Sequence, residues 1–336
     1  MADGSSILVV GGAGYIGAHC CKALSEAGFA PVCFDNLSTG HRDFVKWGPL
    51  VVGDIRDCEA VKHTLDHHSI VAVMHFAALS LVGESVKDPE KYFVNNVAGT
   101  LSLLAAMRDR GCNRLVFSST GAVYGTVGRG AVREDVAGFP VNPYGASKWM
   151  IEQILSEYRR AYQFSSICLR YFNASGADLS GEIGEYRDIE THLIPRAMMA
   201  LQGHVRDFAI FGDDYETPDG TAIRDYVHVH DLALAHISAL NRLLEGDPGG
   251  SFNLGTGQGY SVRQVLSAIA HETGRQVPVM IKPRRPGDPA ILVADPSAAN
   301  HNLKFSTTCS SLPTIVRSAW AWHKRAHPNL NVKDQD

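Results

Sequence analysis

Residues 7–17 have the sequence Ile-Leu-Val-Val-Gly-Gly-Ala-Gly-Tyr-Ile-Gly, a short apolar run that leads straight into glycines. The apolar run predicts a buried strand, and the pattern of the residues after it predicts a helix. Glycines at this spacing permit a tight turn, close approach of the backbone to a pyrophosphate, and close packing of helix on strand. The free N–H groups at the start of such a helix attract phosphate. We therefore expect a dinucleotide to bind at Gly11, Gly14 and Gly17.

An acidic residue follows where this type of site requires one. Asp35 ends the second predicted strand, where a carboxylate can bind both hydroxyls of an adenosine ribose and repel a 2′-phosphate. The sequence therefore predicts NAD rather than NADP as the cofactor. Asp54 and Ile55 follow the third predicted strand and can contact the adenine.

Short β-branched runs alternate with longer helical patterns through the first half of the chain, which is typical of a parallel sheet covered by helices on both faces. We expect an α/β fold with a Rossmann-type doubly wound parallel sheet and a smaller C-terminal α/β substrate lobe. We assign residues 1–175 to the NAD-binding domain, with segments near 221–240 returning to it, and residues 176–336 to the smaller lobe. The predicted strands are 7–10, 32–34, 50–52, 72–75, 114–117 and 166–169, and the predicted helices are 16–27, 58–67, 89–110 and 143–164.

The composition excludes several classes of protein. The 336 residues carry a formal net charge of −4 and no long basic run, so neither nucleic acid nor a membrane surface is expected as a partner. No apolar stretch approaches the roughly 20 residues that cross a bilayer. Seven scattered cysteines predict reduced thiols, and fifteen histidines form no known metal-ligand pattern. We expect a cytoplasmic protein without a metal site.

Tyr144 is the one tyrosine of eleven that has a lysine, Lys148, four residues later. Asn142 can cap the predicted helix and Pro143 suits its first position, so the spacing places both side chains on one helix face. Thr120 ends the preceding strand and should place a hydroxyl near the same crevice. We predict that Tyr144, Lys148 and Thr120 are catalytic.

Such a constellation can make a tyrosine act as a base at neutral pH. A free tyrosine has a pKa of about 10, so a depression of about three units, or ~4 kcal/mol of preferential phenolate stabilisation, is required. A nearby ammonium supplies about one to three units, and a positively charged nicotinamide adds to this effect. Once hydride neutralises the nicotinamide, the tyrosine becomes a weaker acid, which couples proton transfer to hydride transfer. Thr120 can hydrogen-bond the reacting oxygen throughout.

Taken together, these residues resemble the extended short-chain dehydrogenase/reductase family, and within it the UDP-glucose 4-epimerases. The resemblance runs from about residue 7 to residue 322. The glycine motif and the Tyr-x-x-x-Lys pair mark the superfamily, whereas other motifs point to the epimerase group. The motifs that point to the epimerase group are Val82-Gly-Glu-Ser85, Tyr171-Phe-Asn-Ala-Ser-Gly-Ala177, Arg224-Asp-Tyr-Val-His-Val229 and Asn253-Leu-Gly-Thr-Gly257. The resemblance also rests on Asp35-Asn-Leu-Ser38, Gly53-Asp-Ile-Arg-Asp57, His75-Phe-Ala-Ala78 and Arg170-Tyr-Phe-Asn173.

The resemblance implies a role for each matching residue. Tyr144 would be the base and acid, Lys148 its activator and Thr120 its hydroxyl partner. Two arginines would suit a pyrophosphate because they form charge-assisted hydrogen bonds. The implied NAD contacts are Tyr15, Ile16, Asp35, Asn36, Asp54, Ile55, Phe76, Ala77, Asn95, Lys148 and Tyr171. The implied UDP-sugar contacts are Thr120, Tyr144, Asn173, His192, Leu193, Ala209, Phe211, Arg224, Arg285 and Asp288.

The activity implied by the resemblance is NAD-dependent inversion of C4 of a UDP-hexose. Hydride leaves C4 while Tyr144 takes the 4-OH proton, and the 4-ketosugar then swings about its pyrophosphate link and regains hydride on the opposite face. NAD is regenerated in each turnover and can stay bound. The family also implies a homodimer in which the predicted helices 89–110 and 143–164 pair across a two-fold axis. The sequence alone equally allows their apolar stripes to face the sheet.

Three residues depart from the family pattern. Thr120 stands where many members have serine, and Ser80 stands where a lysine is often found, which removes one cationic cofactor contact. Leu292 stands where some members carry a tyrosine. A smaller residue there admits an N-acetyl group, although leucine is still bulky. UDP-N-acetylhexosamines therefore stay open as alternative substrates. UDP-pentoses, such as UDP-arabinose and UDP-xylose, stay open as well, because nothing in the sequence reports on C6 of the sugar.

Two further readings concern the activity itself. A 4,6-dehydratase is disfavoured because Gly121 and Ala122 follow the threonine where such enzymes have Asp-Glu. A catalytically silent NAD sensor is the alternative from another class of protein. The intact catalytic residues argue against it, since a sensor would be free to lose them.

Overall fold

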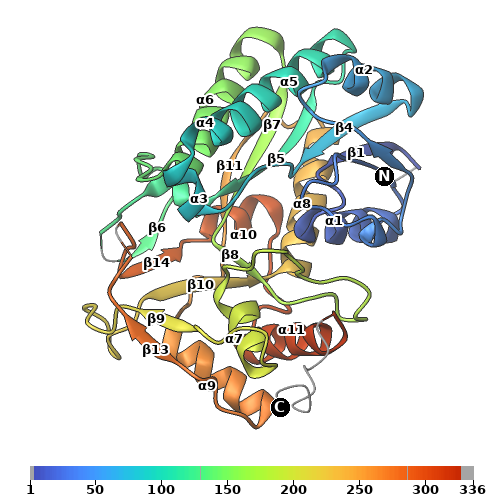
Figure 1. The fold of residues 1–336 in the computed structure, drawn as a ribbon. Helices are drawn as coiled ribbons and strands as arrows, with labels where there is room; N and C mark the ends of the chain where they lie inside the picture. Colours follow the sequence, from blue (N-terminus) through green and yellow to red (C-terminus); the bar gives the residue numbers. More distant parts are fainter. Residues whose placement is uncertain (1–3, 129, 286, 327–336) are drawn as a thin grey trace.

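Seven parallel strands form the largest sheet in the computed structural model, which describes residues 4–128, 130–285 and 287–326. Their order is β3-β2-β1-β4-β5-β7-β11, so the chain winds outward from β1 in both directions (Figure 1). A crevice forms at the carboxyl ends of the strands where the winding direction changes, between β1 and β4. The strands are β1 (Ser6–Val10), β2 (Ala30–Asp35), β3 (Leu50–Val52), β4 (Ile70–His75), β5 (Arg114–Thr120), β7 (Ser165–Tyr171) and β11 (Gly249–Leu254).

Helices cover both faces of this sheet because successive strand residues point to opposite sides. Ile7 and Val9 belong to one buried apolar cluster, whereas Leu8 and Val10 belong to the other. No helix among the described residues combines the length and apolar character needed to span a bilayer. The first face carries α1 (Tyr15–Glu26), α8 (Val229–Leu244) and α10 (Ser297–Leu303), and the second carries α2 (Cys58–His67), α5 (Gly99–Asp109) and α6 (Pro143–Tyr162).

The predicted fold class is confirmed, and each of the six predicted strands lies within an observed one. The predicted helix 89–110 is wrong in one respect, because it consists of α4 (Pro89–Tyr92), the π-helical stretch η2 (Phe93–Ala98) and α5. Within η2, the Asn96 amide accepts from Leu79 N at 2.9 Å and donates to Ser147 Oγ at 3.0 Å. These bonds tie the wider turn to the loop after β4 and to α6. Such π-helical stretches often mark functional sites.

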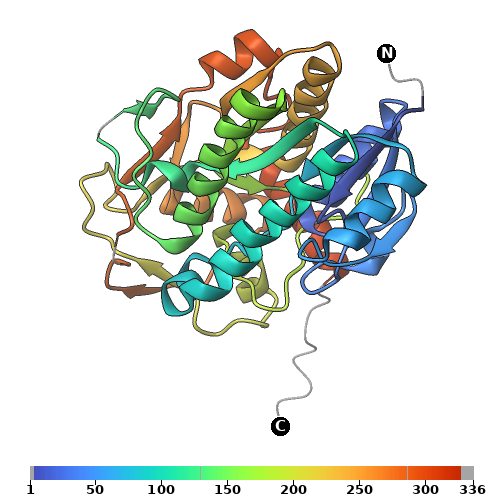
Figure 2. The same cartoon turned by 90° about the horizontal axis from the view of Figure 1, so that it is seen from above.

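Helix α6 packs on the sheet with one face and leaves another face exposed. The cap is as predicted, since Asn142 Oδ1 accepts from Gly145 N at 2.8 Å. Ile151 and Leu155 are buried against the sheet, whereas Met150 is 46% exposed. Figure 2 shows α6 beside the segment formed by α4, η2 and α5 on the outside of the molecule.

The smaller lobe is built around one strand, β10 (Ile223–His228), which pairs with strands from three other parts of the chain. The sequence predicts an α/β lobe here without the bounds of its elements, and three helices pack together into a separate apolar cluster. They are α7 (Leu193–Leu201), α9 (Val262–Thr273) and α11 (Leu312–Ala326). The other elements are η1 (Arg42–Phe44), α3 (Val82–Lys87), η3 (Gly121–Tyr124), β6 (Ala131–Val132), β8 (Asn173–Ser175), β9 (Ala209–Phe211), β12 (Gly259–Ser261), β13 (Met280–Lys282) and β14 (Ile291–Ala294).

The chain returns to the large sheet after it has entered the smaller lobe. Helix α8 packs against α1, strand β11 pairs with β7 along the edge of the large sheet, and α10 joins the same apolar cluster. By contrast, β10, which falls within the segment 221–240, lies in the smaller lobe. The division after residue 175 therefore needs correction, since the apolar face and the edge of the sheet are completed only by these later segments.

Candidate active site

The residues expected to contact a dinucleotide follow the carboxyl ends of neighbouring strands in the large sheet. Because parallel strands end at the same edge, these residues share one crevice. Other expected residues come from helical segments instead: Tyr15, Ile16 and Gly17 from the first turn of α1, Asn95 from η2 and Lys148 from α6. The positions after the strands are Gly11 after β1, Asp35 at the end of β2, Asp54 and Ile55 after β3, Phe76 and Ala77 after β4, and Tyr171 at the end of β7.

The turn after β1 leaves no space for side chains. Gly11 has a φ of +80°, and a Cβ atom there would lie 2.5 Å from Ala77 N. A Cβ atom on Gly17 would lie 2.2 Å from Gly11 O. Gly14 is the N-cap of α1, and no side chain caps its first N–H groups. The backbone therefore forms a cradle whose amides and helix dipole fit the pyrophosphate of a dinucleotide.

Asp35 is held at the rim of this cradle. Its carboxylate is 8% exposed and accepts from Ala13 N at 3.0 Å and from Leu37 N at 2.8 Å. Burial raises the pKa of Asp35, and these two hydrogen bonds oppose the shift. A carboxylate has about four acceptor sites, so it can still accept from ribose hydroxyls. The chemistry of the site fits NAD.

Thr120 and Tyr144 are brought together, as expected for catalytic partners. Thr120 is the last residue of β5, and its hydroxyl hydrogen-bonds the phenol of Tyr144 in the first turn of α6. Lys148 is only 3% exposed, and its ammonium contacts two residues of β5. Its Nζ donates to Ser118 O at 2.8 Å and lies 4.7 Å from the centroid of the Phe117 ring.

The charges of the protein alone do not ionise the phenol. Burial raises the pKa of Tyr144, although the hydrogen bond from Thr120 and the positive charge of Arg187 act to lower it. Burial also lowers the pKa of Lys148 to about 7, against the opposing charge of Glu152. That Lys148 lowers the pKa of the phenol stays a prediction.

A first group of expected substrate residues lines one cavity in the smaller lobe. Asn173, His192 and Leu193 all border it, together with the buried Glu185. His192 Nδ1 lies 3.0 Å from Glu185 Oε1 and 2.8 Å from Glu190 Oε1. Burial alone would lower the pKa of His192, but the two carboxylates outweigh it and raise the pKa to about 10. At neutral pH this side chain is therefore a cation, which suits a diphosphate.

The other expected substrate residues form two separate contacts. Arg224 on β10 forms an ion pair with Asp288. The guanidinium carbon of Arg285 lies 4.1 Å from the centroid of the Phe211 ring on β9, the strand that also contains Ala209. The structure thus places the predicted substrate residues at the pair of Thr120 and Tyr144, at this cavity and at these two contacts.

Several charged residues in the crevice and behind it have no role predicted from the sequence. Glu185 and Arg187 are paired at 3.1 Å in the loop before α7, and nothing in their spacing predicts this. Glu152 lies behind the crevice and is paired with Arg170 at 2.6 Å. A signal for Glu152 exists, because it lies four residues after Lys148 on the same side of α6.

A sequence model of the NAD dependent epimerase/dehydratase family matches residues 7–255. The chain belongs to this family. A member from Rhizobium leguminosarum bv. trifolii, named UDP-glucose 4-epimerase, is 48% identical over 324 residues, which cover 96% of this chain and 99% of the relative.

Solved structures of epimerases share the fold of this family member. A UDP-glucose 4-epimerase from Brucella ovis in complex with NAD is 52% identical, with a TM-score of 0.92 over 94% of this chain and 97% of that one. A UDP-glucose-4-epimerase from Stenotrophomonas maltophila, with bound NAD and formylated UDP-arabinopyranose, is 39% identical, with a TM-score of 0.93 over 96% and 98%.

The departures from the family pattern lie around the crevice. Leu292 is the register partner of Arg224 and packs, with Phe172, against a small buried cluster of Val123, Tyr124 and Val132. The surroundings of Leu292 are therefore apolar. Ser80 is partly buried in the loop before α3.

Replacing the phenol tests the predicted base. We expect Tyr144→Phe to retain its fold and bound NAD but to lose turnover by ~100-fold or more, the usual contribution of general acid–base catalysis. Tyr162→Phe is the matched control, because it makes the same change near the far end of α6. Measurement of kcat, NAD content and melting temperature for both variants separates the effects. Full activity in Tyr144→Phe would remove the proposed base.

The raised pKa of His192 gives a pH prediction. Its folded value of about 10 exceeds the ordinary 6.5, so its contribution to stability is fully present below pH 6.5 and is lost as the pH rises through about 10. NMR titration of labelled histidine should show an imidazolium at His192 throughout the neutral range. Glu190→Gln should lower that pKa. A wild-type titration near 6.5 would contradict the ion-pair network.

Proposed function

We propose that this protein interconverts UDP-glucose and UDP-galactose by NAD-dependent epimerisation at C4. The observation that carries the proposal is the hydrogen-bonded pair of Thr120 and Tyr144 beside a dinucleotide cradle. Family membership over nearly the whole chain, with relatives named UDP-glucose 4-epimerase, supports the same activity. The enzyme therefore belongs to nucleotide-sugar metabolism, and its link to galactose use is part of the proposal.

Different residues of the chain have different roles in the reaction. Tyr144 takes the proton of the 4-hydroxyl as C4 is oxidised and returns it when C4 is reduced, while Thr120 hydrogen-bonds the same oxygen. When bound, NAD supplies the hydride acceptor and the positive charge that the buried phenol otherwise lacks. The glycine cradle and Asp35 would hold it, with Lys148 and Tyr171 on the side of the reacting atoms.

Epimerisation also requires a firmly held diphosphate and a sugar that can turn. The cations His192, Arg224 and Arg285 are suited to the diphosphate because each can form charge-assisted hydrogen bonds with it. We propose the smaller lobe as the UDP-sugar-binding part of the protein, with Asn173, Leu193 and Phe211 as further contacts. The apolar edge at Leu292 would let the ketosugar swing without a fixed partner.

The alternative substrates are less well supported. The relative named above is a UDP-glucose 4-epimerase, which favours a UDP-hexose over a UDP-pentose or a UDP-N-acetylhexosamine. The 4,6-dehydratase and the NAD sensor are not favoured either, because the catalytic residues and the epimerase relatives point to turnover at C4.

We propose further that the protein is a cytoplasmic homodimer. All seven cysteines are free thiols, as expected in a reducing compartment. Val94, Leu101 and Met150, on η2, α5 and α6, are 44%, 41% and 46% exposed and border one apolar hollow on the outer helices. An exposed apolar face of this kind is typical of a protein interface. A two-fold axis through it would pair the same helices of two copies.

Purified protein should convert UDP-galactose to UDP-glucose without added cofactor. The expected result follows from regeneration of NAD in every turnover. A panel of UDP-glucose, UDP-N-acetylglucosamine, UDP-xylose and UDP-glucuronate, followed by chromatography, should show the hexose as the preferred substrate. NAD-loaded protein that turns over none of these would support the sensor and refute the enzyme.

A charge on the apolar outer face should disrupt the proposed dimer. We expect Leu101→Glu to shift the protein from dimer to monomer in light scattering, because a buried interface cannot solvate a carboxylate. Leu234→Glu is the matched control, since Leu234 is 43% exposed on α8 at the opposite face of the large sheet. Equal masses for both variants would argue against this face as the interface.

A further inference from the structure

Three successive residues at the end of β5 each contact one residue of α6. The residues on α6 are four positions apart and therefore lie on one side of the helix, a turn apart. Two of these contacts, those of Tyr144 and Lys148, belong to the catalytic constellation. The third joins Ser119 Oγ to Glu152 Oε1 at 2.5 Å. The pairs are Thr120 with Tyr144, Ser118 with Lys148 and Ser119 with Glu152.

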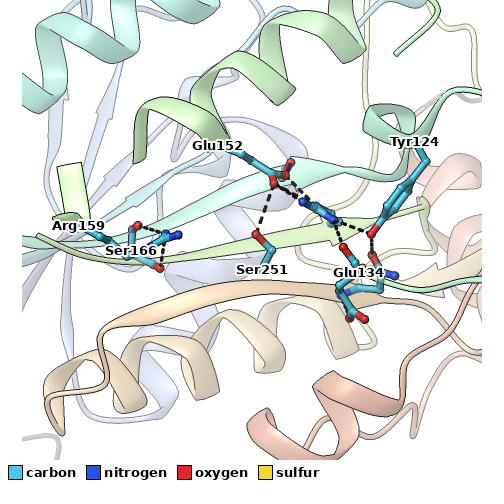
Figure 3. Close-up of polar contacts among 9 residues, drawn as sticks. Tyr124, Glu134, Glu152, Arg159, Ser166 and Ser251 are labelled. Atoms are coloured by element: carbon cyan, nitrogen blue, oxygen red, sulfur yellow. Dashed lines mark hydrogen bonds and ion pairs between the residues drawn. The ribbon is translucent and has the colours of Figure 1, made fainter. Parts of the chain in front are cut away.

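Glu152 is also held from the neighbouring strand. It is 4% exposed, and both its oxygens lie 3.0 Å from Arg170 Nε on β7, with Oε2 2.6 Å from Nη2 (Figure 3). Ser119 and Arg170 are register partners on β5 and β7. Two adjacent strands therefore hydrogen-bond the same carboxylate from paired positions. Ser251 Oγ on β11 lies 3.4 Å from the same carboxylate.

Further hydrogen bonds continue from Arg170 across the sheet. Arg170 Nη1 donates to Tyr124 Oη at 2.7 Å, and Tyr124 Oη donates to Asn253 Oδ1 at 2.7 Å (Figure 3). Two of the sequence motifs singled out above, those that begin at Arg170 and Asn253, thus meet behind the crevice. A buried ion pair contributes little net stability, since desolvation of the charges offsets their attraction. The pair of Glu152 and Arg170 instead fixes the position of α6 relative to β7.

We infer that Glu152 is a positioning residue for the reaction, which fixes the register of α6 on β5 through Ser119 and Arg170. This inference rests on the proposed function, because it concerns the distance between the phenol of Tyr144 and the hydroxyl of Thr120. A slip of α6 along β5 would separate these two groups while leaving the apolar contacts of the helix largely intact. A misplacement of about 1 Å can cost ~100-fold in rate.

The same helix offers a matched control. Ser166 on β7 is fully buried, like Ser119, and its Oγ accepts from Arg159 Nη1 of α6 at 2.9 Å (Figure 3). This contact also ties α6 to the large sheet, but it lies farther along the helix from Tyr144. Loss of either serine hydroxyl removes one buried bond between helix and strand, and only one of these bonds lies at the catalytic end.

The experiment compares Ser119→Ala with Ser166→Ala in the NAD-loaded enzyme. Both variants should lose a similar amount of thermal stability. We expect Ser119→Ala to lower kcat for UDP-galactose at least ~10-fold with KM changed less than ~3-fold, whereas Ser166→Ala keeps kcat within ~2-fold of wild type. A second pair, Ser119→Thr and Ser119→Val, keeps the side-chain volume equal and differs only in the hydroxyl. The threonine variant should retain ~10-fold more of kcat than the valine variant.

The outcomes separate this inference from the proposed function. Wild-type kcat in Ser119→Ala, or an equal loss of kcat in both alanine variants, would overturn the positioning role. If Ser119→Ala does not fold, equal kcat in the threonine and valine variants would overturn it instead. Absence of turnover in the wild-type enzyme would refute the proposed function itself, before any variant is compared.

Discussion

The seating of helix α6 against the end of strand β5 is the contact on which the active site depends. One helical residue step turns a side chain by about 100°, so a small error in register would direct the Tyr144 phenol away from Thr120. Apolar packing by Ile151 and Leu155 holds the helix to the sheet but specifies its register only loosely, since close-packed apolar surfaces tolerate repacking. The directional bonds of Lys148 and Glu152 supply what packing does not.

Much of the large domain could be predicted because its signals are local. Buried parallel strands appear as apolar runs, the glycine turn has a steric cause at Gly11 and Gly17, and Asn142 caps α6 as its side chain allows. The smaller lobe gave weaker signals, since strands such as β8, β9 and β12 have three residues each and pair with distant segments. Its α9 did carry a local signal that could have located it, the capping box of Ser261 and Gln264.

The candidate site was predictable as a set of residues but not as a set of charges. A motif places Tyr144 and Lys148 one turn apart, yet only the folded chain shows that the ammonium is bonded to Ser118 O and that burial dominates the phenol. In the same way, the cationic state of His192 depends on Glu185, which lies in the irregular segment before α7, where no helix or strand spacing predicts a contact. Ionisation is a property of tertiary surroundings, which sequence patterns do not specify.

The late return of the chain to the large sheet constrains how the protein can be made. Until β11 has left the ribosome, β7 is an open strand edge, and until α8 follows α1 one apolar face of the sheet lacks its cover. The dinucleotide cradle lies near the N-terminus, but its supporting sheet is complete only after more than two thirds of synthesis. Nascent chains therefore expose the unpaired edge of β7 for a long interval, during which chaperones can bind them. For the same reason, a truncated N-terminal fragment is prone to aggregation.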